Sequence, residues 1–150
     1  MKKLKTIATA VAMLIAASSF ANGGDNNAAN ATVRAAFKKD FAAAENVNWT
    51  KKNDVVFASF QLNGNTAEAA FNENGDLIAV SRHMATSQLP LHVSVNIAEK
   101  YAGFQVAKNA VEITYEGQTN YYINVSDNKN VLRLKCASSG SISIDSKKKV

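Results

Sequence analysis

The sequence of 150 residues predicts an α+β fold in which one antiparallel sheet carries two helices on one face. Two observations predict this fold. An amphipathic helical pattern occurs twice, 60 residues apart, and a series of strand patterns separated by turn residues follows each occurrence. We therefore expect two helix-plus-meander repeats, covering about residues 31–84 and 89–145.

The first helix is predicted over residues 31–44 by apolar residues at every fourth position: Val33, Phe37 and Phe41. The second helix has the same spacing: Val93, Ile97 and Tyr101. Pro90 suits the first turn of a helix because its missing N–H costs nothing there. Gly103 suits the left-handed residue that ends one.

Strand patterns follow each helix, and Gly-containing turns such as Asn74-Gly75 separate them. The predicted strands cover residues 54–62, 66–71 and 77–83 in the first half, and residues 111–115, 119–125, 131–136 and 141–144 in the second. The spacings Val33 to Gly75 and Val93 to Gly140 correspond if about five residues are inserted near positions 107–110.

Alternation along the strands predicts which side chains face the helices. In the first half, Val56, Ala58, Phe60 and Leu62 are expected to face them, while Val55, Phe57, Ser59 and Gln61 point away. In the second half, Tyr121, Ile123 and Val125 are expected to face the helices, while Tyr122, Asn124, Arg133 and Lys135 point away. The face opposite the helices is then open to water or to a partner.

Residues 1–21 have the pattern of a secretory signal peptide. Three lysines precede an apolar run from Thr6 to Ala17, which is too short for a membrane span, and cleavage is expected after Ala21. The lone cysteine, Cys136, lies far from that position, so we expect no lipid anchor. The signal predicts export to the periplasm or the extracellular space.

Composition divides the remaining chain into a flexible leader over residues 22–30, a single domain over residues 31–146 and a basic tail over residues 147–150. The signal and the tail together hold six of the 17 basic residues, and 12 acidic residues balance the other 11. A domain near neutrality argues against nucleic-acid binding, which needs clustered Lys and Arg. Cys136 follows Leu132 and Leu134 in an alternating apolar pattern, which favours a buried, unreactive thiol.

The sequence lacks the patterns of catalytic and metal sites, so we expect a protein that is not an enzyme and binds no metal or cofactor. His83 and His92 lack the spacing of a metal motif, and no Gly-x-Ser-x-Gly nucleophile turn occurs. Residues 72–76 weakly resemble a calcium loop but lack its closing Glu, which favours a plain hairpin turn.

Several segments resemble the PepSY-like family of small exported bacterial proteins, whose fold is related to that of the beta-lactamase inhibitor protein (BLIP). The most specific are Asn46-Val47-Asn48-Trp49 and Leu89-Pro90; the others are Phe71 to Leu77 and Tyr101 to Phe104. The resemblance implies a BLIP-like α+β fold and a role in binding or restraining other proteins.

These observations favour an exported, non-catalytic module that binds another exported or envelope protein, with inhibition of a peptidase or envelope enzyme as one form of that binding. The expected binding surface is the open sheet face, with two rings and two cations: Phe57, Tyr122, Arg133 and Lys135. The alternative is a periplasmic carrier that holds a small apolar or envelope-derived ligand between helices and sheet.

Overall fold

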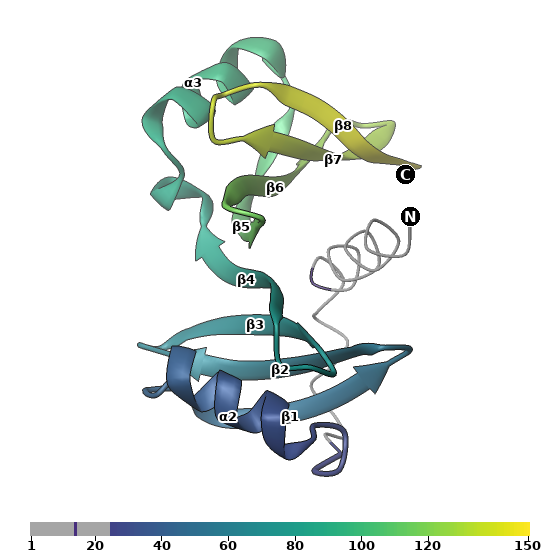
Figure 1. Ribbon diagram of the computed structural model, residues 1–150. Coiled ribbons are helices and arrows are strands. Elements are labelled where there is room, and N and C mark those ends of the chain that lie inside the picture. The colour runs from purple at the N-terminus through teal and green to yellow at the C-terminus, as the bar shows by residue number, and fades with distance from the viewer. Residues whose placement is uncertain (1–13, 15–24) are drawn as a thin grey trace. The chain divides into compact units, whose positions relative to one another are not determined.

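The computed structural model describes residue 14 and residues 25–150 (Figure 1). Apart from residue 14, the predicted signal peptide lies outside the described residues. Over residues 25–150 the fold is α+β, with an eight-stranded antiparallel sheet in the order β1-β2-β3-β4-β5-β6-β7-β8 and two α-helices. Within the described part of the chain, no helix has the length and apolar character that a membrane crossing requires.

The chain divides into two compact units, the first ending at Arg82 and the second beginning at His83. The first unit contains α2 (Ala31–Asp40), β1 (Glu45–Lys52), β2 (Val55–Leu62), β3 (Asn65–Asn72) and most of β4 (Leu77–Ala85). The second contains the short 3-10 helix η2 (Thr86–Gln88), α3 (Leu91–Lys100), β5 (Gln105–Tyr115), β6 (Gln118–Ser126), β7 (Asn130–Ala137) and β8 (Ile142–Lys149). In both units a helix precedes four strands. The sequence predicts a helix before each set of strands, with four strands in the second half and three in the first. Whether the two helices cover the same face of the sheet stays a prediction.

The residues before α2 are held in place from Asp25 onward, although a flexible leader was expected there. The backbone N–H of Asp25 donates to the carbonyl of Trp49 at 2.8 Å, and the side chain of Asn30 caps α2 by accepting from the N–H of Val33 at 2.9 Å. Arg34 donates to the carbonyls of Ala29 and Asn26. Backbone and capping hydrogen bonds therefore hold residues 25–30, which their Asn-rich composition does not reveal.

The first helix is shorter than predicted, and an additional strand follows it. α2 ends at Asp40, where the N–H of Phe41 closes the last turn on the carbonyl of Phe37. β1 begins at Glu45 and pairs with β2, with Trp49 opposite Ala58. Strand β1 is missing from the prediction because polar and charged residues surround Trp49 and hide any clear alternation.

An aromatic cluster around Phe37 forms the core of the first unit. It lies between α2 and the strands that this helix covers in Figure 1. The ring centroid of Phe37 lies 5.1 Å from that of Trp49, 5.0 Å from that of Phe60 and 6.3 Å from that of Phe71, each in an edge-on arrangement. Val56, Ala58, Phe60 and Leu62 all belong to this core. The predicted orientation of β2 is therefore confirmed.

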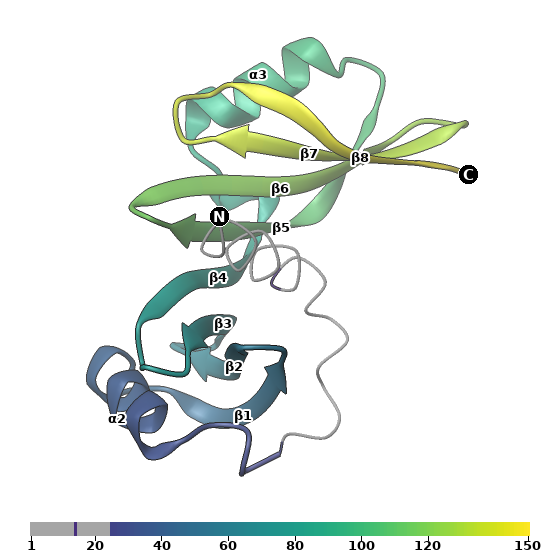
Figure 2. The same ribbon diagram turned by 45° about the vertical axis from the view of Figure 1, so that its right-hand side comes forward.

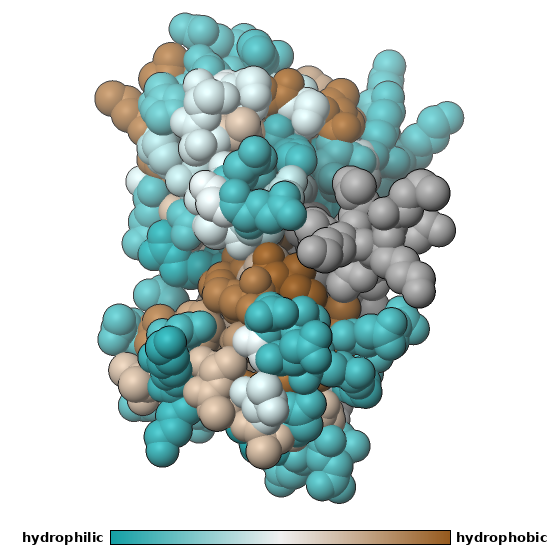
Figure 3. Space-filling view, viewed as in Figure 1, coloured by the Kyte–Doolittle hydropathy of each residue, from teal (hydrophilic) through white to brown (hydrophobic). Residues whose placement is uncertain are grey.

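The core of the second unit is mainly aliphatic. It lies on the side of the strands that carries α3 in Figure 2. Val93 and Ile97 of the helix belong to it together with side chains from three neighbouring strands: Ala110, Tyr121, Ile123, Val125, Leu132, Leu134 and Cys136. These include all three β6 residues that were expected to face the helix. Leu91 and Val95 of α3 are exposed instead, where Figure 3 shows hydrophobic side chains reaching the surface near this helix.

The corresponding glycines Gly75 and Gly140 occupy matching places in the two units. Each has positive φ in the turn that joins the last two strands of its unit, and each turn contacts the helix of its own unit. A Cβ on Gly75 would meet Thr32 of α2 at 3.2 Å, and one on Gly140 would meet Asn96 of α3 at 2.8 Å. Asn96 also donates to the carbonyl of Gly140 at 2.8 Å. The expected insertion near residues 107–110 falls within β5, whose pairing with β6 is irregular between Val106 and Ala110.

The last strand extends beyond its prediction and includes the basic residues at the C-terminus. β8 continues to Lys149, with Lys147 opposite Leu132 and Lys149 opposite Asn130. A solvated tail was expected because three consecutive lysines suggest no strand. Their side chains are exposed, and lysines on an edge strand discourage pairing with another chain.

Candidate functional site

The strands of the first unit have two faces, which the pairing register defines. Trp49, Ala58 and Ala69 lie side by side on the face that α2 covers. Residues adjacent to these in sequence point to the opposite face. Four polar side chains lie side by side there, which we call the polar row: Asn48, Ser59, Glu68 and Ser81. The row therefore crosses β1, β2, β3 and β4 on the face away from α2.

The part of the polar row on β3 and β4 contains buried polar atoms that have no hydrogen-bond partner among the described residues. Glu68 is 2% exposed and Ser81 is 0% exposed. Among the described residues, neither the Oε2 atom of Glu68 nor the Oγ atom of Ser81 has a hydrogen-bond partner. Burial raises the pKa of the Glu68 carboxyl to about 8, because desolvation disfavours its charged form. A buried polar atom without a hydrogen-bond partner destabilises a fold and is uncommon in native proteins, so Glu68 and Ser81 are candidates for a functional role.

An apolar row runs beside the polar row on the same face. It consists of Phe57, Ala70 and Ala79, which are neighbours across β2, β3 and β4. Phe57 lies on the face away from α2, as predicted, but the expectation of an exposed ring is wrong, because only 2% of the residue is exposed. Its neighbours Ala70 and Ala79 are buried as well.

In the second unit, three of the predicted binding residues lie together on the face away from α3. Tyr122 of β6 pairs with Lys135 of β7, and Arg133 lies two positions from Lys135 on the same face of β7. Tyr122 is only 5% exposed, so it is also more buried than expected. Burial, together with the negative charge of Asp145, raises the pKa of its phenol to about 12. The fourth predicted residue, Phe57, belongs to the first unit.

The charges on this face of the second unit are partly paired. The Nε atom of Arg133 lies 2.6 Å from the Oδ2 atom of Asp145 on β8, and both side chains are partly exposed. Lys135 is half-buried. The carboxylate of Asp145 therefore has a cation within hydrogen-bond distance.

The sequence interpretation missed Glu68 and Ser81. A signal was present: in the predicted strand Thr66–Phe71, Glu68 is the only charged residue and is surrounded by Ala67, Ala69 and Ala70. Which residues of neighbouring strands lie beside it depends on the pairing register. Only that register places Ser59 and Ser81 on either side of Glu68.

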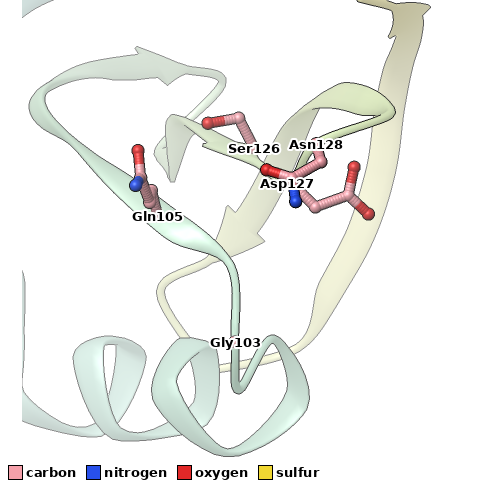
Figure 4. A pocket seen from close by; sticks show the side chains of 5 residues that line it. All are labelled: Gly103, Gln105, Ser126, Asp127 and Asn128. Carbon is pink, nitrogen blue, oxygen red and sulfur yellow. The ribbon is translucent and has the colours of Figure 1, made fainter.

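The second unit contains a small polar cavity of about 160 Å³, lined by Gly103, Gln105, Ser126, Asp127 and Asn128 (Figure 4). The Oδ1 atom of Asp127 accepts from the backbone N–H of Lys129 at 2.8 Å and of Asn130 at 2.6 Å. These hydrogen bonds lower the pKa of the Asp127 carboxyl. The carboxylate therefore stabilises its own turn, and the cavity offers little to an apolar ligand.

Other groups that could support chemistry have structural roles. In the described part of the chain, no three His, Cys, Asp or Glu residues are placed to bind a metal ion. The Nε2 atom of His92 lies 2.7 Å from the carbonyl oxygen of Ser138 and so links α3 to the β7–β8 turn. Cys136 is buried, as predicted, and burial raises the pKa of its thiol to about 11. Asn72 accepts from the N–H of Asn74 and of Asp76, which confirms a hairpin turn there.

The arrangement of helices and strands defines a BLIP-like fold, and solved structures share it. A BLIP-like protein from Bacteroides fragilis superposes with a TM-score of 0.69 at 22% identity, over 81% of this chain and 86% of that one. A DUF2874 family protein from Bacteroides ovatus gives a TM-score of 0.71 at 22% identity, over 85% of this chain and 90% of that one.

A third similar structure is a protein from Bacteroides eggerthii that is provisionally described as periplasmic. It matches with a TM-score of 0.69 at 18% identity, over 81% of this chain and 89% of that one. No family model matches the sequence, so the specific PepSY-like resemblance has no support from that comparison. The search of curated proteins also finds no match. At these identities the similarity concerns the fold.

Proposed function

We propose that this chain is an exported, non-catalytic protein that binds another exported or envelope protein through the sheet face opposite its helices. The observation that carries the proposal is the composition of this face. Each unit places an aromatic residue on this face, Phe57 in the first and Tyr122 in the second. The two rings are almost buried, and the more exposed side chains on the same face are polar or charged, such as Gln61, Asn124 and Lys135. Rings surrounded by polar groups are typical of the energetic centres of protein interfaces.

The similar structures support the proposal in two respects. One is described as BLIP-like, and another is provisionally described as periplasmic. The signal pattern of residues 1–21 agrees with export. Inhibition of a peptidase or envelope enzyme is the more specific form of the proposal.

No observation favours the carrier hypothesis. The space between α2 and its strands is filled by the aromatic cluster around Phe37, and that between α3 and its strands by the aliphatic core. A small apolar ligand would have to displace these side chains.

Site-specific photo-cross-linking in the producing cell tests the proposed surface. A photoreactive residue is placed at Gln61 or Asn124, which are exposed on the sheet face in question, and at Lys39 or Lys100 on the helices as matched controls. We expect both sheet positions to cross-link to the same envelope protein and the helix positions to give no such product. Cross-linking from the helix positions alone would contradict the proposal.

A further inference from the structure

We propose that Glu68, flanked by Ser59 and Ser81, binds the cationic side chain of a Lys or Arg residue of the protein partner. This inference rests on the proposed function and assigns the chemistry of one subsite within that surface. It starts from the unpartnered Oε2 atom of Glu68 and Oγ atom of Ser81, both on buried residues.

A cationic hydrogen-bond donor satisfies the site best, because it supplies donors and favours the ionised form of Glu68. An ionised carboxylate only accepts hydrogen bonds, and serine hydroxyl oxygens can also accept them. A Lys ammonium has three donors and an Arg guanidinium has five, so either can bond to Glu68 and to a flanking serine at once. The positive charge also compensates the cost of an ionised carboxylate in a desolvated position.

The polar row leads from an exposed residue, Asn48, to the buried Glu68. Asn48 is exposed, Ser59 is half-buried, and Glu68 and Ser81 are buried, so burial increases along the row from β1 inward. Neighbouring strands lie about 4.8 Å apart. A cation that enters beside Ser59 therefore has about one strand spacing to cross, which matches a long, unbranched side chain better than a short one.

The apolar row beside the polar row suits the stem of such a side chain. Lys and Arg bury their methylene groups along apolar surfaces while the charged end finds polar partners. Phe57 offers a ring, and Ala70 and Ala79 offer methyl groups beside it. The two rows together therefore match both halves of one Lys or Arg side chain.

Calorimetric titration of the exported, purified protein tests the inference with two acetylated peptides. The peptides are Ala-Phe-Lys-Phe-Ala amide and the same peptide with norleucine, which keeps the stem and lacks the charge. We expect the lysine peptide to bind about tenfold more tightly or better, the difference that one charge-assisted hydrogen bond supplies. Equal affinities, or no binding of the lysine peptide at millimolar concentration, would overturn the inference.

Glu68→Gln should remove the preference for lysine, because the neutral amide lacks the charge and keeps the size of the side chain. Glu99→Gln is the matched control, since it makes the same change at an exposed position on α3 and should leave the preference intact. If Glu68→Gln fails to fold, Ser81→Ala takes its place and should reduce the preference. A preference for lysine that persists in the folded variant would overturn the inference.

The cross-linking experiment separates failure of this inference from failure of the proposed function. If Glu68→Gln leaves both the cross-link from Gln61 to the envelope partner and the lysine preference unchanged, the sheet face binds a protein and the assignment of Glu68 is wrong. If the lysine peptide binds through Glu68 but no envelope protein cross-links to the sheet positions, the proposed function is wrong.

Discussion

The two faces of the strands in the first unit differ in how completely their groups are satisfied. On the face covered by α2, the rings of Phe37, Trp49 and Phe60 pack edge to face with centroids about 5 Å apart. On the opposite face, Glu68 and Ser81 are buried with polar atoms that lack a partner among the described residues. The first face has the features of a stabilising core, and the second has groups that a ligand could satisfy.

The second unit provides a further contrast. On its face away from α3, the carboxylate of Asp145 already has Arg133 as a partner at 2.6 Å. The chain therefore pairs one carboxylate internally and leaves another without a described donor on Oε2. This difference is why we assign the cation subsite to Glu68.

The largest expected change in stability comes from a substitution on the face of the strands that α2 covers. Phe37→Ala removes the ring at the centre of the aromatic cluster and should lower the free energy of unfolding by about 3 to 5 kcal/mol. Lys38→Ala, at the next and exposed position of α2, should change it by less than about 0.5 kcal/mol. Urea denaturation measures both variants, and equal midpoints would show that α2 does not stabilise the unit through Phe37.

A smaller effect is the dependence of the free energy of unfolding on pH that Glu68 causes. Its pKa is raised from 4.5 to about 8 in the folded state, so the folded protein holds this proton where the unfolded chain releases it. Its contribution to stability is fully present below pH 4.5 and is lost as pH rises to about 8. The free energy of unfolding then changes by at most about 1.4 kcal/mol per pH unit.

Glu68→Gln should remove this slope, while Glu99→Gln should retain it. Ser59 and Ser81, the cross-strand neighbours of Glu68, do not titrate in this range, so they add no slope of their own. Urea midpoints measured between pH 4 and 9 test the prediction. An unchanged slope in Glu68→Gln would mean that other groups cause the pH dependence.

The next effect concerns the segment before α2. Arg34→Ala removes hydrogen bonds to the carbonyls of Ala29 and Asn26 and the stacking of the guanidinium on Trp49 at 5.3 Å. We expect a loss of about 1 kcal/mol and faster amide exchange at residues 25–30, with Lys39→Ala as the control on the same helix. Unchanged exchange at these residues would show that Arg34 does not hold the segment.

The smallest expected effect is that of the partly exposed ion pair in the second unit. Asp145→Asn should cost about 0.5 kcal/mol or less, because solvent screens the attraction between Arg133 and Asp145. Thermal unfolding at low and high salt measures it, and the difference from the wild type should shrink at high salt. A loss of several kcal/mol would show that this face of the second unit depends on its charge pairing.

How far the sequence predicts the structure depends on the range of the interactions. The spacings of Val33 and Phe37 and of Val93 and Ile97 predict both helices, and turn residues predict most strands, because these signals are local. The alternation in β2 also predicts that Phe57 points away from α2. β1 and the ordered segment from Asp25 were missed because they depend on long-range pairing, such as the bond from Asp25 to Trp49.

The candidate site was predicted only in part, for the same reason. Tyr122 and Lys135 can be placed on one face from strand alternation, but their cross-strand pairing requires the register. The burial of Phe57 could not be predicted from alternation, which gives the direction of a side chain and says nothing of its exposure. The polar row around Glu68 appears only when β2, β3 and β4 are aligned.

The most direct test of the proposed cation subsite is the pKa of the Glu68 carboxyl. It can be measured by carbon NMR titration of the exported protein with and without the lysine peptide. We expect a pKa well above the usual 4.5 in the free protein, near the value of about 8 that desolvation favours. Bound lysine should lower that pKa, because the cation stabilises the ionised form. An ordinary pKa of Glu68 in the free protein, or the same raised pKa with and without the peptide, would contradict the proposed cation subsite.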